Sequence, residues 1–455
     1  MSPLTAPPPT VSPPAAHSPT LTAHPRPVTD AGQRLCAAVD GLAGHLADQA
    51  AENDRAGRFA APSVRRLEEA GLLAACVPVA DGGAGLDSVH DLGVVTARLA
   101  EADASVATAV FMHLALSMHF ARTAAAAPAR DTPQRRWTRA IGERRMIVCS
   151  TVTEPGTSAW LPATVAVPEG GGWTVTGRKA MASLSPVATH FYTRLRAETP
   201  DGPMIGSVLI PGDLKGVEVH DSWDGHGLRG SGSGTVAFDR VRLPWEAVGF
   251  RGRWGERPGT GALGGKVRVA APLLGVPLGI AEAAHRTALA ALSGDGQGSS
   301  GAGDGTPGRR RTGAAGTTAA LAELETALVS ARGVLRCLLL DVDAHDADAH
   351  GPDLMRACIA AGTVVERAAL HAVDLAMQLC GGGSYRAGHL LGRLARDVRA
   401  TMFMRPHAPA EEWADVLADL ALADAPPTAS HAAPPVAPPV APPVAVPAAA
   451  PEGTP

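Results

Sequence analysis

The sequence predicts an α+β protein made of three consecutive domains: helical, then β, then helical again. Apolar residues recur at helical spacing up to about residue 143 and after about residue 251. Between these regions they alternate in short runs, separated by Gly, Pro and Asp turns. Because no helical pattern intervenes between these runs, an antiparallel sheet or small barrel is expected. The 455 residues suffice for two or three domains with a large buried core.

The domain boundaries follow changes in pattern and composition. Both ends are rich in Pro, and the tail repeats Ala-Pro-Pro-Val, a composition that needs no packed core. The predicted parts are a disordered segment 1–28, a helical domain 29–143, a β domain 144–250, a helical bundle 251–424 with a Gly-rich loop 294–316, and a disordered tail 425–455. The strand candidates are Ile147–Val152, Trp173–Thr176, His190–Arg196, Ile205–Ile210, Val217–His220 and Thr235–Phe238.

The charge and the cysteine spacing argue against several classes of binding partner. The net charge is −4 with both signs mixed, which gives no reason to expect nucleic acid. The six cysteines are far apart in sequence, so neither a disulfide framework nor a metal site is predicted. The amino terminus lacks a signal-peptide pattern, and no apolar run reaches the roughly 18 residues that span a bilayer. A cytoplasmic protein without a membrane partner is therefore expected.

Four local motifs occur in a fixed order along the chain. They are Pro78 with Gly82-Gly83-Ala84-Gly85-Leu86; Thr153-Glu154-Pro155-Gly156 with Gly177-Arg178-Lys179; Gly227-Leu228-Arg229-Gly230-Ser231 followed by Phe238 and Pro244; and Gln378-Leu379-Cys380-Gly381-Gly382 followed by Arg396-Asp397. Together they resemble the acyl-CoA dehydrogenase superfamily over residues 30 to 423. The resemblance implies an amino-terminal helical domain, a middle β domain and a carboxy-terminal four-helix bundle.

The resemblance also implies a flavin site. Val152 and Thr153 would contact the pyrimidine side of the ring, Ser183 would place a hydroxyl near N5, and Met181 takes the place of the usual Trp. A second group would approach the adenine dinucleotide half from a neighbouring subunit: Gln378, Gly381 and Gly382. The implied cofactor is FAD in a homodimer or homotetramer. The family's Arg-x-x-Phe-Gly motif is missing, which leaves FMN as the alternative.

The activity implied first is α,β-dehydrogenation of an acyl thioester, carried by coenzyme A or a carrier protein, with an electron-transfer partner. Ser158 and Ala159 occupy the place of small residues near the thioester and are the predicted substrate contacts.

The catalytic base of that reaction is not identified. Counting eight residues from Asp397, where most members carry a glutamate, gives Arg405, whose guanidinium cannot accept a proton. The alternative position near Val269 has no carboxylate either, because Lys266 and Arg268 are its charged neighbours; Glu282 lies further along. The nearest remaining candidates are His407, Glu411 and Glu412.

Two other functions do not require the catalytic base that the sequence lacks. The first is a two-component flavin monooxygenase or N-hydroxylase of the same fold, which takes reduced flavin from a reductase and forms a C4a-hydroperoxide. His407 or His226 could then assist oxygen activation. The second is a protein that binds flavin or an acyl group without turnover.

Overall fold

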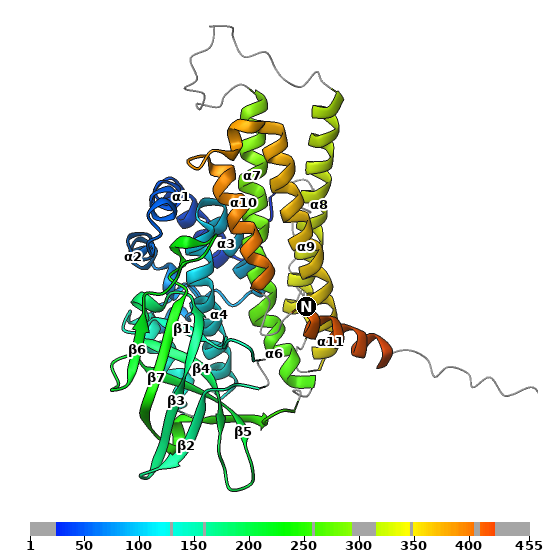
Figure 1. Ribbon diagram of the computed structural model, residues 1–455. Helices are drawn as coiled ribbons and strands as arrows, with labels where there is room; N and C mark the ends of the chain where they lie inside the picture. Colours follow the sequence, from blue (N-terminus) through cyan, green and yellow to red (C-terminus); the bar gives the residue numbers. More distant parts are fainter. Residues whose placement is uncertain are drawn as a thin grey trace, which may run out of the picture.

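A computed structural model describes residues 24–127, 131–157, 161–256, 260–293, 315–345, 349–404 and 410–423. Side chains are described within these ranges except at 260–264, 315, 410–414 and 416. The described chain forms a helical region, then a β-sheet, then a second set of helices that packs beside the first (Figure 1). The three-part order expected from the periodicity of apolar residues is therefore present.

The amino-terminal helices enclose much of the core. They are α1 (Asp30–Ala56), α2 (Ala61–Glu69), α3 (Val89–Ala102), α4 (Ala104–Ala126) and α5 (Pro133–Gly142). Asp103 caps α4, because its carboxylate accepts hydrogen bonds from the amides of Ser105 and Val106. Ala104–Ala126 and Gly265–Ser293 are long and apolar enough to cross a membrane, but 83% and 78% of these stretches is buried inside the protein. Such burial is that of core helices.

The middle region is one mixed sheet. Its strands are β1 (Val148–Thr151), β2 (Val165–Glu169), β3 (Gly172–Ala182), β4 (His190–Ala197), β5 (Met204–Pro211), β6 (Val217–His220), β7 (Gly234–Pro244) and β8 (Gly249–Arg253). They run in the order β6-β7-β3-β2-β4-β5-β8, with β1 beside β4. Most pairs are antiparallel, but β4 pairs in parallel with both β1 and β2. The expectation of a purely antiparallel sheet was wrong at these two pairings.

The carboxy-terminal helices complete the molecule. They are α6 (Thr260–Ala270), α7 (Gly275–Ser293), α8 (Ala315–Ala344), α9 (Gly351–Cys380), α10 (Leu390–Ala400) and α11 (Ala410–Ala423), with short 3₁₀ turns at η6 (Ala271–Leu274) and η9 (Thr401–Phe403). One continuous apolar core joins them to the amino-terminal helices. A Cβ on Gly279 would lie 2.2 Å from the carbonyl oxygen of Ala97, so glycine permits α7 to approach α3 closely.

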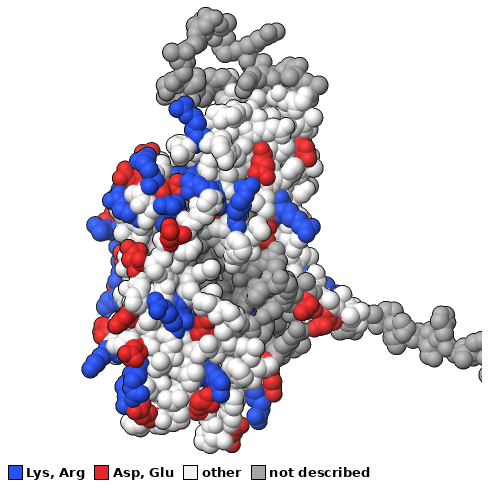
Figure 2. Space-filling view, viewed as in Figure 1, with Lys and Arg blue, Asp and Glu red and all other residues white. Residues whose placement is uncertain are grey.

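Charged side chains of both signs are interspersed over the face shown in Figure 2, without a broad area of one sign. That pattern agrees with the small net charge of −4. It gives this face no electrostatic preference for a polyanion.

Candidate flavin site

A cavity opens where the sheet meets the two sets of helices. Its volume is about 1020 Å³, counting the solvent at its mouth. One wall comes from the sheet and its loops: Ser150, Val152, Thr153, Met181, Ser183, Trp223, Leu228 and Ser233. The other comes from helices: Thr108, Met112, Val269, Ala270, Leu273, Ala400, Phe403 and Met404. We call these the β wall and the helical wall.

Two strand ends build the centre of the β wall. β1 ends at Thr151, so Val152 and Thr153 are the first residues beyond that strand. The amide of Ala180 in β3 donates to the carbonyl of Thr153 at 3.0 Å, which joins the two segments. Met181 adopts a positive φ of 51°, a backbone conformation that costs a non-glycine residue energy. The backbone of Val152 and Thr153 and the side chain of Met181 therefore border the same cavity.

A buried ion pair fixes this arrangement. Lys179 Nζ lies 3.0 Å from Glu154 Oε1, and the two side chains are 0% and 4% exposed. Glu154 also accepts hydrogen bonds from the amides of Ala163 and Thr164, both at 2.6 Å. Burial alone would raise the pKa of Glu154, but the Lys179 charge and these hydrogen bonds together hold it below its usual value. Burial lowers the pKa of Lys179 to about 8, so both groups are charged at neutral pH.

The conspicuous Glu and Lys of the sequence motif therefore have a structural role. They tie the loop after β1 to β3, and they do not line the cavity. Thr153 of the same motif and Val152 directly before it do line the cavity. The motif predicts the shape of the pocket because its charged members position its uncharged members.

Hydroxyl groups extend along the β wall. Ser183 Oγ and Ser233 Oγ lie 2.8 Å apart, and Ser233 Oγ lies 2.7 Å from Ser231 Oγ. Cys149 Sγ donates to the carbonyl of Ser183 at 3.1 Å. A hydroxyl can donate or accept, so this chain can adapt to a ring whose nitrogen and oxygen atoms change protonation with oxidation state.

Leu228 is held from the helical side. Its φ is 51°, and its amide donates to Asp397 Oδ1 at 2.7 Å. Trp223 Nε1 donates to the carbonyl of Leu228 at 2.9 Å. Burial raises the pKa of Asp397 to about 7, although the Leu228 amide and Arg393 oppose this shift. The Arg-Asp signature on α10 thus positions a residue of the cavity.

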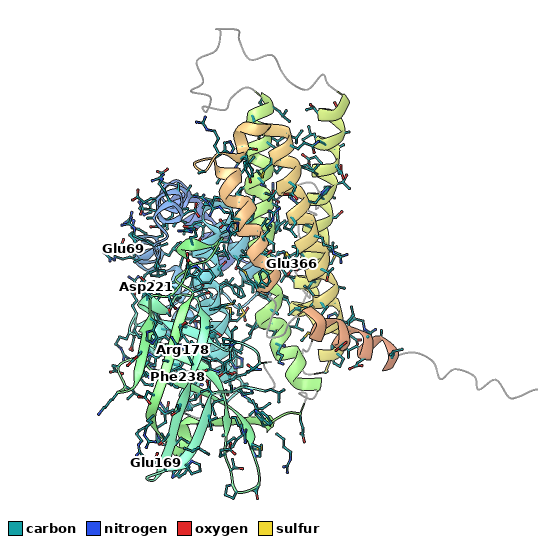
Figure 3. The ribbon with its side chains drawn as sticks, in the orientation of Figure 1. Glu69, Glu169, Arg178, Asp221, Phe238 and Glu366 are labelled. Atoms are coloured by element: carbon teal, nitrogen blue, oxygen red, sulfur yellow. The ribbon has the colours of Figure 1, made fainter. Side chains whose placement is uncertain are left out.

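The helical wall is apolar and carries no carboxylate among its described side chains. Val269 occupies the place where a minority of dehydrogenases were expected to carry their base, and it does line the cavity. Glu282 does not: it forms two 2.6 Å hydrogen bonds with Arg332 inside the bundle. Glu366, labelled in Figure 3, lines an adjoining apolar cavity of about 540 Å³ that shares Ala270, Leu273 and Met404 with this one.

The predicted cofactor residues divide into two groups. Val152, Thr153, Met181 and Ser183 are brought together on the β wall. The second group, Gln378, Gly381 and Gly382, lies at the end of α9 and is absent from the lining of this cavity. Their predicted contact with a neighbouring subunit's cofactor stays a prediction.

Several of the predicted substrate-binding and catalytic residues lie outside the part of the chain that the structure describes. Ser158, Ala159, Arg405 and His407 fall outside the described residues, as do the side chains of Glu411 and Glu412. His226 is described, and its carbonyl accepts a hydrogen bond from Arg396 at 3.1 Å. Its side chain does not line the cavity.

Sequence reasoning missed most of the helical wall and part of the β wall. Thr108 and Met112 stand four residues apart on α4 and so share a face, but only packing shows that this face meets the cavity. Ser233 could have been found from the motif at 227–231, because it follows Ser231 closely. Trp223 and Phe403 belong to no motif quoted above.

The residues present fit a flavin ring. One wall offers hydroxyls and strand-end backbone for the polar edge, and the opposite wall offers methionine, leucine and valine side chains for an apolar face. Such a division suits a planar group that is polar along one edge.

Comparison with known proteins agrees with this geometry. The chain matches the family models for the acyl-CoA dehydrogenase N-terminal domain at residues 33–129, the middle domain at 149–241 and the C-terminal domain at 310–405. It is 34% identical to L-evernosamine nitrososynthase of a Micromonospora species, over 84% of this chain and 88% of the relative. It is 33% identical to the amino sugar nitrososynthase DnmZ of Streptomyces peucetius, over 87% and 95%.

One solved structure has both ligands in its name. KijD3 in complex with FMN and dTDP-3-amino-2,3,6-trideoxy-4-keto-3-methyl-D-glucose is 32% identical to this chain, with a TM-score of 0.76, covering 87% of this chain and 95% of that one.

These relatives correct the expected reaction. Acyl-thioester dehydrogenation was the leading expectation, and it was wrong: the relatives that match over most of the chain at 30–34% identity are named for nitroso synthesis on amino sugars. The motifs that suggested a dehydrogenase report the fold and the flavin pocket, which both kinds of enzyme share. The chain belongs to the acyl-CoA dehydrogenase superfamily and is one of its flavin-dependent oxidoreductases.

Proposed function

We propose that this protein is a flavin-dependent monooxygenase that oxidises the amino group of an amino sugar linked to a nucleoside diphosphate. The proposed flavin is FMN, supplied in reduced form by a separate flavin reductase. The similarity to amino sugar nitrososynthases and to KijD3 supports the substrate class. The missing Arg-x-x-Phe-Gly motif supports FMN over FAD.

The observation that carries the proposal is the lack of a carboxylate in the described lining of the cavity. Dehydrogenation of a thioester needs a general base at the α-carbon. Oxygen transfer to nitrogen instead needs the lone pair of an uncharged amine. Apolar surroundings disfavour an ammonium ion and lower the pKa of an amine, whereas a nearby carboxylate would raise it. A wall of Met112, Val269 and Leu273 therefore favours the reactive form of the substrate.

The residues have separate roles in this proposal. Val152, Thr153 and Ser183 orient the flavin ring, and Met181 contacts its face. Bound reduced flavin supplies the electrons that activate dioxygen. The helical wall excludes water from the reacting centre, which protects an activated oxygen species from wasteful breakdown. Gln378, Gly381 and Gly382 would act across an interface of a homodimer or homotetramer.

The test is a coupled assay under air with FMN, NADH, a flavin reductase and a dTDP-linked amino sugar. Mass spectrometry should detect a hydroxylamine or nitroso sugar, and omitting the reductase should abolish it. The matched sugar with a hydroxyl in place of the amine should be unchanged. If the amino sugar is recovered unaltered, or if acyl-CoA reduces the bound flavin under anaerobic conditions, the proposal is wrong.

A further inference from the structure

Two arginines lie together on one face of the sheet, and a third lies on α6, which contacts α4. Arg194 on β4 is the cross-strand partner of Ser207 on β5. Arg251 on β8 donates from Nε to Ser207 Oγ at 2.9 Å, which brings the second guanidinium to the first. Arg268 on α6 is the third member. We call Arg194, Arg251 and Arg268 the arginine cluster.

His119 on α4 lies near enough to Arg251 and Arg268 for both charges to act on it. Burial, together with the charges of Arg251 and Arg268, lowers the pKa of His119 to about 4, so both guanidinium groups act on one imidazole. The ring of the adjacent Phe120 lies 6.2 Å from that of Tyr192, two residues before Arg194 on the same face of β4. At neutral pH His119 is uncharged and can donate one hydrogen bond.

Within the described part of the chain, no member of the arginine cluster forms an ion pair with a carboxylate, whereas nearby Arg196 lies 2.8 Å from Glu198. The Nε of Arg268 is buried without a hydrogen-bond partner. Burial lowers the pKa of Arg194, and Arg251 lowers it further. Like charges gathered at a partly buried place are unfavourable unless an anion binds among them.

The arginine cluster adjoins one end of the cavity. Arg268 directly precedes Val269, which lines the helical wall. Ser150 lines the β wall, and it is the register partner of Tyr192 on β4. His119 follows the lining residue Met112 by two helical turns on α4. A long ligand with its reactive end in the cavity could therefore place an anionic portion here.

We propose that the arginine cluster, with His119, is the subsite that holds the diphosphate of the nucleoside-diphosphate-linked substrate. This inference rests on the proposed function. Guanidinium forks bind phosphate oxygens with two parallel hydrogen bonds, and three of them with a neutral imidazole suit a group with two adjacent phosphates. The flavin's own phosphate shares this chemistry, so the test must separate the two sources.

The experiment measures binding without turnover. Isothermal titration calorimetry follows thymidine diphosphate binding to the FMN-saturated protein and to its R251Q and R268Q variants. Each variant should bind thymidine diphosphate at least about tenfold more weakly, because a charge-assisted contact is lost. R268K should recover part of the affinity. The matched control is R253Q, because Arg253 lies two residues away on β8, is exposed like Arg251, and bonds to the carbonyl of Asp201 instead of Ser207; it should bind like wild type.

A second arm titrates FMN into each apoprotein and follows flavin fluorescence. Unchanged FMN affinity in R251Q and R268Q, together with normal thermal unfolding, assigns the arginine cluster to the substrate. If FMN affinity falls while thymidine diphosphate affinity is unchanged, the arginine cluster holds the flavin phosphate and the inference is overturned. The inference is also overturned if R251Q, R268Q and wild type bind thymidine diphosphate with equal affinity, or if wild type does not bind it.

The two proposals can fail separately. If the proposed function is wrong, the coupled assay gives no oxidised amine even where thymidine diphosphate binding depends on Arg251 and Arg268. If the subsite is wrong and the function right, both variants oxidise the amino sugar with an unchanged KM.

Discussion

The two walls of the cavity differ in how they are built and in what they decide. The β wall is polar, formed by consecutive residues at two strand ends, and fixed by the buried Glu154–Lys179 pair. The helical wall is apolar and assembled from α4, α6, η6, α10 and η9, which lie far apart in sequence. The β wall carries the residues that the family resemblance assigns to the flavin ring. In the proposed function the helical wall would face the substrate and so select the reaction.

The largest expected effect comes from breaking the anchor of the β wall. Lys179→Met leaves Glu154 buried without its countercharge, which should lower the free energy of unfolding by about 3–5 kcal/mol. Thermal and urea unfolding measure this loss. The matched control is Arg178→Met on the same strand, because Arg178 is exposed (Figure 3). If the two variants are equally stable, the ion pair does not hold the β wall.

The second prediction concerns Asp397, which holds Leu228 from α10. Its folded-state pKa of about 7 lies above the ordinary 3.8, so its stabilising effect is complete below pH 4 and is lost as pH rises through 7. Buried Asp103, with a pKa raised to about 6, contributes a similar slope. Asp397→Asn should remove about 2–3 kcal/mol of the stability change between pH 5 and 7.

Urea unfolding at several pH values measures how the free energy of unfolding changes with pH. Asp374→Asn, at a largely exposed carboxylate on α9, should keep the wild-type pH dependence. Parallel curves for Asp397→Asn and wild type would show that Asp397 does not titrate in this range.

A third prediction adds to the helical wall the charge that it lacks. In Val269→Glu a carboxylate would stabilise the substrate as an ammonium ion, and oxidation of the amino sugar should slow by about ten- to a hundredfold. The control is Val269→Gln, because glutamine has nearly the same size as glutamate but no charge. The difference between the two variants measures the electrostatic effect alone. Steady-state rates over pH 6 to 9 measure the effect, and the Glu variant should recover as pH rises. Equal rates for the two variants would remove the electrostatic argument.

The smallest effect is expected at the hydroxyl chain of the β wall. Ser183→Ala should weaken FMN binding by about fivefold, because one hydrogen bond contributes about 1 kcal/mol. Fluorescence titration of the apoprotein measures this affinity. Ser222→Ala is the control, because Ser222 lies in the same region and, among the described residues, its hydroxyl bonds only to Thr235. Unchanged FMN affinity in Ser183→Ala would place this hydroxyl away from the flavin.

The same contrast explains what the sequence could predict. The four predicted flavin-ring residues lie in or within a few residues of one pair of short motifs, so their proximity could be predicted. The helical wall depends on how distant helices pack, which no local pattern records. Strand β2 was missed because Pro168 interrupts its pattern, and β8 because its five residues are all exposed. The reaction was misassigned because the motifs describe the pocket shared by dehydrogenases and oxygenases.

The central claim is that oxygen from dioxygen enters the substrate's amino group. The direct measurement is the coupled assay under ¹⁸O₂ in ordinary water, followed by mass spectrometry of the sugar product. Heavy oxygen should appear on the amino nitrogen. A product that carries no heavy oxygen, or an acyl thioester that is desaturated in its place, would contradict it.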